Sequence, residues 1–66
     1  MTRLERRMRD ALEGNEREVL QHYNAEIAAE QNRKAQSHNA FILQCCDQQI
    51  ERLLAEKQQI EAATID

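Results

Sequence analysis

The sequence predicts an all-α protein that folds as an antiparallel helical hairpin with a short N-terminal helical segment. The 66 residues contain no proline and one glycine, and they are rich in Glu, Gln, Arg, Ala and Leu, which lose little rotamer freedom in a helix. Apolar residues recur every three or four positions in two long segments. Between Ile27 and Phe41 there is no apolar residue larger than alanine, so a turn is expected there.

The N-terminal segment, residues 1–13, places Leu4, Met8, Ala11 and Leu12 on one face of a helix. Gly14 then marks the clearest break, because glycine can end a helix in the left-handed conformation. Asn15 is expected to cap the next helix, with Glu18 three residues later as in a capping box. We expect a short appendage before this break, and the sequence leaves open whether it is ordered without a partner.

Two long helices are predicted, over residues 15–34 and 38–63, with Ser37 or Asn39 available to cap the second one. On one straight helix their apolar stripes would lie on nearly opposite sides, whereas a hairpin lets the stripes face each other. The predicted hairpin core is Leu12, Val19, Tyr23, Ile27, Ile42, Cys46, Ile50, Leu53 and Ile60.

One continuous coiled-coil helix is the alternative fold. Its support is a strict heptad register that joins Leu4, Met8 and Ala11 to the apolar residues between Leu43 and Ile60. Between Asn15 and Asn39, however, this register holds polar residues and alanine, which make a poor coiled-coil seam. The hairpin is therefore the preferred prediction.

Phe41 and Cys45 are four residues apart, so they share one side of their helix, away from the stripe that pairs with the first long helix. They are expected either to cap the end of the hairpin or to form an outward apolar patch for docking. The second reading is preferred, and it gives three candidate partner-binding residues: Leu20, Phe41 and Cys45.

No group of residues predicts catalysis, a metal or a cofactor. Cys45 and Cys46 are adjacent and lack the Cys-x-x-Cys spacing, while His22 and His38 are distant in sequence. A nucleophilic cysteine needs a histidine and an acid around a pocket, which a two-helix hairpin does not enclose. We expect His22 to be half-buried at the edge of the core, and we expect the chain not to be an enzyme.

The charge pattern does not favour nucleic acid, because the net charge is −3 and acidic residues are interleaved with Arg3, Arg6, Arg7 and Arg9. These arginines are expected to form a solvated face. The longest apolar run is far shorter than the roughly 20 residues of a membrane span, so a cytoplasmic location is expected. A chain this short has a marginal core of its own, and association is the expected additional source of stability.

The opening residues Met1 to Met8 (MTRLERRM) and the break at Glu13-Gly14-Asn15, followed by two amphipathic segments, resemble the YscE-type proteins of bacterial type III secretion, a virulence apparatus. Members of that family tend to have glycine at the hairpin turn, whereas residues 32–39 contain none. The resemblance implies a small antiparallel hairpin. It also implies a cytoplasmic co-chaperone that binds a helical-repeat (TPR-like) chaperone, and with it keeps the needle subunit soluble before export.

The alternative function is a homodimeric coiled-coil or four-helix scaffold, or a small regulator, in which two hairpins cover each other's apolar stripes. Neither function involves a cofactor.

Overall fold

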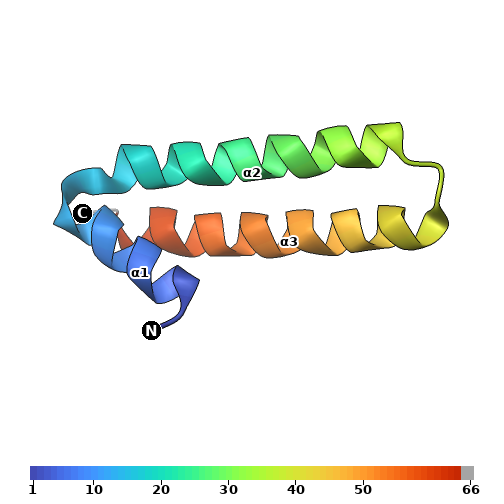
Figure 1. Ribbon diagram of the computed structural model, residues 1–66. Coiled ribbons are helices and arrows are strands. Elements are labelled where there is room, and N and C mark those ends of the chain that lie inside the picture. The colour runs from blue at the N-terminus through green and yellow to red at the C-terminus, as the bar shows by residue number, and fades with distance from the viewer. Residues whose placement is uncertain (65–66) are drawn as a thin grey trace.

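Two long antiparallel helices form the body of the protein, and a short third helix packs beside them. The computed structural model describes residues 1–64. Its elements are α1 (Arg3–Asp10), a π-helical junction η1 (Ala11–Asn15), α2 (Glu16–Gln36) and α3 (Ala40–Ala63). α2 and α3 run side by side along a molecule of 42 × 19 × 19 Å, and α1 folds back near the end of α3 (Figure 1). The predicted all-α hairpin with a short N-terminal segment is confirmed.

α1 begins with a complete capping box, which was not among the features predicted from the sequence. Thr2 Oγ1 accepts a hydrogen bond from the backbone N–H of Glu5 (3.2 Å), and Thr2 N donates to Glu5 Oε1 (3.3 Å). Thr-x-x-Glu is the usual sequence pattern of this motif. The cap gives the N-terminal segment a defined start, and residues 3–10 are helical against the chain's own hairpin.

Gly14 separates α1 from α2 through its left-handed backbone, with φ 107° and ψ 2°. It is the one residue with positive φ between residues 1 and 64. The predicted cap at Asn15 is wrong, since its side chain makes no capping hydrogen bond. Its φ of −99° and ψ of 23° differ from the extended backbone that lets an N-cap side chain reach the first amides.

The turn between α2 and α3, residues 37–39, is closed by side-chain hydrogen bonds rather than by glycine. Asn39 Oδ1 accepts from the backbone N–H groups of Phe41 (2.8 Å) and Ile42 (3.4 Å), so Asn39 is the cap of α3. Ser37 Oγ accepts from the N–H of Asn39 (3.2 Å). Ser37, after α2, and Asn39, before α3, both have extended backbone conformations, so neither position requires glycine.

The core lies along the α2–α3 interface. Of the predicted core residues, those that the structure buries are Val19, Tyr23, Ile27, Cys46, Leu53 and Ile60, and those that it half-buries are Ile42 and Ile50. The prediction for Leu12 is wrong, because its side chain is 62% exposed and Ala11 is buried instead. Leu12 precedes Gly14, whose left-handed turn breaks the helical phase used to place Leu12 on the stripe of α2.

Candidate interaction surface

Glu56 is a buried carboxylate at which the three α-helices meet. It is 7% exposed, on the edge of the apolar stripe of α3. Tyr23 Oη of α2 donates to Oε1 at 3.3 Å, while Arg3 of α1 donates to Oε2 at 3.0 Å. Arg52 Nε, one turn away on α3, lies 3.5 Å from Oε2. The carboxylate thus has partners at both oxygens, as a buried charge requires.

Arg7 connects α1 to α2 by two kinds of contact. Its guanidinium carbon lies 4.5 Å from the centre of the Tyr23 ring, a cation–π contact. It also forms a two-pronged ion pair with Glu26, with Nη1 3.2 Å from Oε2. These hydrogen bonds lower the pKa of Glu26 and raise that of Arg7, whereas burial is the main reason that the pKa of Tyr23 is raised.

The predicted solvated arginine face is therefore only partly present. Arg6 and Arg9 are exposed, but Arg3 and Arg7, four residues apart on α1, reach Glu56 and Glu26. Sequence reasoning missed both acidic partners. The available signal was Glu56 itself, a carboxylate three residues after Leu53 and four before Ile60, at the spacing of the apolar stripe.

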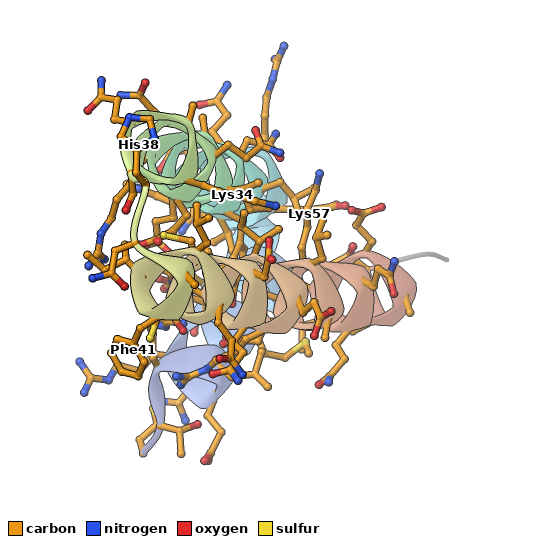
Figure 2. All side chains as sticks on the ribbon, turned by 90° about the vertical axis from the view of Figure 1, so that its right-hand side faces the viewer. Lys34, His38, Phe41 and Lys57 are labelled. Carbon is orange, nitrogen blue, oxygen red and sulfur yellow. The ribbon has the colours of Figure 1, made fainter. Side chains whose placement is uncertain are left out.

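Phe41 is a large apolar side chain that is exposed to solvent at the turn end of the hairpin. It is 71% exposed and points away from α2 (Figure 2). The reading of Phe41 as a cap over the end of the hairpin is wrong, because a cap would be covered. Cys45, one turn further along α3, is half-buried on the same side of the helix.

The third predicted partner-binding residue, Leu20, is not part of this surface. It is half-buried and packs against the core near the start of α2. Because α2 and α3 are antiparallel, the start of α2 and the start of α3 lie at opposite ends of the hairpin (Figure 1). At about 1.5 Å per residue, Leu20 and Phe41 are separated by roughly 25 Å along the axis. Phe41 and Cys45 alone therefore make up the turn-end surface of the hairpin.

A second face of the hairpin holds an open groove of about 590 Å³ between α2 and α3, lined by Gln31, Lys34, Ala35, Ser37, Leu43, Asp47 and Ile50. Lys34 and Asp47 form an ion pair there, and this hydrogen bond raises the pKa of Lys34. Lys34 of α2 and Lys57 of α3 extend to the same side of the molecule (Figure 2). Leu54, 41% exposed, shares the side of α3 that carries Leu43 and Ile50.

The residues considered for metal or thiol chemistry do not converge. Cys46 is buried, which raises the pKa of its thiol, and no three His, Cys, Asp or Glu residues within residues 1–64 form a group able to hold a metal. His22 and His38 are both exposed. The half-buried position expected for His22 is wrong, because the residue adjoining Tyr23 in sequence is rotated off the buried stripe.

Glu30 Oε2 is buried without a hydrogen-bond partner in the described part of the chain, and the nearest cation, Arg33 Nη1, lies 3.9 Å away. The Glu30 side chain as a whole is 21% exposed.

Comparison with family models, curated proteins and solved structures gave no match to this chain. Within residues 1–64, none of the helices has the length and apolar character needed to cross a membrane.

Proposed function

We propose that this chain is a non-enzymatic, cytoplasmic co-chaperone of the YscE type. It binds a helical-repeat (TPR-like) chaperone and, with it, keeps the needle subunit of a type III secretion system soluble before export. The observation that carries the proposal is the turn-end surface. Phe41 is 71% exposed, although the core of the hairpin is already buried without it. The resemblance of residues 1–8 and 13–15 to the YscE-type family supplies the kind of partner.

The location of the core supports an interaction role for Phe41. Tyr23, Cys46, Leu53 and Ile60 are fully buried within the chain itself, so Phe41 is not required to complete the hairpin. α1 lies toward the other end of α3 and leaves the turn end uncovered (Figure 1). An exposed aromatic residue on a rigid helix suits an interface, where aromatic residues are enriched.

The elongated shape of the chain, 42 × 19 × 19 Å, supports the choice of a helical-repeat protein as the proposed partner. Such solenoids bind extended partners along their inner face, and an exposed helix can place apolar side chains into the groove. The turn end offers the first turns of α3, held by the Asn39 cap, with Phe41 on the outside. Occupying the chaperone in this way would block its self-association.

Co-expression tests the proposal. The chain is produced with a helical-repeat chaperone of a type III secretion system and with the needle subunit of that system. The soluble complex is then isolated through a tag on the chaperone. The proposal expects a complex of all three chains, and a needle subunit that precipitates when this chain is left out. A needle subunit that stays soluble with the chaperone alone would contradict it.

A homodimeric scaffold is the second candidate, and the open groove favours it. Leu43 and Ile50 line the groove, and the partly exposed Leu54 lies on the same side of α3, where a second hairpin can cover all three. Sedimentation of the isolated chain separates the two candidates. A discrete, tight homodimer at micromolar concentration supports the scaffold, and Leu54→Glu should then dissociate it.

A further inference from the structure

α1 is attached to the hairpin mainly at its surface. None of its side chains is fully buried, and Leu4 and Met8 are half-buried against the core. The charged contacts are Arg3 with Glu56 and Arg7 with Glu26, together with the stacking of Arg7 on Tyr23. The Arg3 side chain is 41% exposed and that of Arg7 19%, although Glu56 itself is buried. Because α1 buries none of its own side chains, it can leave its groove, the surface of α2 and α3 beside Glu26 and Glu56, more readily than α2 and α3 can separate.

The hinge that directs α1 onto the hairpin is essentially one residue. Asp10 (φ −57°, ψ −45°), Ala11 (φ −62°, ψ −43°) and Glu16 (φ −51°, ψ −46°) all have right-handed helical backbones. Gly14, at φ 107°, is the residue that turns the chain back. Rotation of Gly14 into the right-handed region, together with a rotation of Asn15 from φ −99° and ψ 23° to helical values, would make α1 continue in the direction of α2 and away from its groove.

We propose that α1 exchanges between two copies of this chain, so that each α1 binds the groove of the other hairpin. The ion pairs identify what binds each hairpin in the dimer, namely the α1 of a second copy. Arg3 and Arg7 stand one helical turn apart, and their acceptors Glu56 and Glu26 lie on different helices of the hairpin. The α1 of a second copy carries the same two arginines at the same spacing, with Leu4 and Met8 beside them. This inference does not depend on the proposed co-chaperone role.

The hinge also sets the balance between the closed monomer and the exchanged dimer. A short linker holds α1 near its own groove at an effective concentration on the order of millimolar, so the monomer dominates at micromolar concentration. A Cβ added at Gly14 would have no atom within 4 Å, so Gly14→Ala strains only the backbone of the closed form. Alanine disfavours the left-handed conformation of the closed monomer by roughly a factor of ten, so a dimer with two opened hinges should have its dimerisation constant raised about a hundredfold.

A pair of charge-reversed chains tests the exchange directly. One chain carries Arg7→Glu and the other Glu26→Arg, both with Gly14→Ala. Alone, each α1 meets a like charge on its own hairpin and on that of an identical copy. Mixed in equal amounts, each α1 finds the opposite charge on the other chain. Native mass spectrometry separates the species, because the two chains differ in mass, and light scattering gives the total dimer.

The proposal expects the mixed dimer to exceed either homodimer by more than about tenfold, since both ion pairs are restored only there. A statistical mixture of the three dimers, as pairing through the open groove would give, would overturn it, and so would a mixture that remains monomeric. The chain with both R7E and E26R is the folding control and should show the helical circular dichroism of the parent chain.

A second measurement needs no charge change. Gly14→Ala in the otherwise native chain should raise the dimerisation constant about a hundredfold. Replacement of Gly14 by the D-enantiomer of alanine, which favours positive φ, should keep the chain monomeric. Equal dimerisation constants for these two chains would overturn the exchange.

Discussion

Tyr23 and Glu56, 33 residues apart in sequence, meet inside the hairpin, where the Tyr23 hydroxyl donates to Glu56 Oε1 at 3.3 Å. Tyr23 is fully buried and Glu56 is 7% exposed, so the hydrogen bond lies beneath α1 rather than at the surface. Arg3 of α1 approaches the second oxygen of the same carboxylate at 3.0 Å. One carboxyl group therefore links the pairing of α2 and α3 to the attachment of α1.

Tyr23→Phe should reduce the free energy of unfolding by about 1–2 kcal/mol, because it removes one hydrogen bond to a charged, buried acceptor. The ring remains, so the stacking of Arg7 is retained and the change isolates the hydroxyl group. Urea denaturation followed by circular dichroism measures the effect. A variant as stable as the parent chain would show that water or Arg52 replaces the hydroxyl at Glu56.

Leu53→Ala should cost about 2–5 kcal/mol, because Leu53 is 2% exposed and its removal leaves a cavity between the helices. In a chain of this size that loss is enough to leave much of the protein unfolded at room temperature. Leu12→Ala is the matched control. Leu12 is 62% exposed, so its truncation should change the stability by less than about 0.5 kcal/mol. Equal losses for the two variants would contradict the placement of Leu12 outside the core.

Asn39→Ala should destabilise the chain by about 1 kcal/mol, since the Asn39 side chain accepts hydrogen bonds from two amides at the start of α3. Asn15→Ala provides the comparison at the start of α2. Its side chain makes no capping hydrogen bond, so its loss should have little effect. Thermal unfolding of the two variants under identical conditions distinguishes the caps, and a larger loss for Asn15→Ala would reverse the assignment.

The stability should fall as the solution is acidified, and Glu26 should contribute to the fall. Hydrogen bonds from Arg7 place the pKa of Glu26 below its ordinary value of 4.5. The stabilisation is therefore fully present above pH 4.5 and is lost as the pH falls through the lower, folded-state pKa. Urea midpoints between pH 7 and pH 3 measure this dependence. Arg7→Met should make the midpoint less sensitive to acid, and an unchanged slope would show that Glu26 does not contribute.

The sequence was sufficient for the two long helices because their apolar residues recur with helical spacing and a polar segment separates them. The turn at Gly14 and the cap at Asn39 were also predictable, because each depends only on the residue's own backbone or on its nearest neighbours in sequence. The prediction for Leu12 assumed that the helical phase of α2 continues back past Gly14. It was wrong because the left-handed Gly14 interrupts the helical rotation.

The position of α1 was not predictable in this way. Arg3 reaches Glu56 across 53 residues of sequence, and Arg7 reaches Glu26 across 19. Such contacts depend on the angle set by Gly14 and on which side of the hairpin α1 meets, and neither is a periodic property of the sequence. The separation of Leu20 from Phe41, by contrast, follows from the predicted antiparallel hairpin, because the starts of its two long helices lie at opposite ends.

The most direct test of the proposed function is the affinity of the intact chain for the helical-repeat chaperone, measured by isothermal titration. Phe41→Asp should weaken binding by more than about 30-fold, as expected for an aromatic residue at the centre of an interface. Leu12→Asp introduces the same charge at another exposed apolar position, away from the turn end, and should leave the affinity within about threefold of the parent chain. Equal affinities for the Phe41→Asp and parent chains, or no binding by the parent chain, would contradict the proposed role of the turn-end surface.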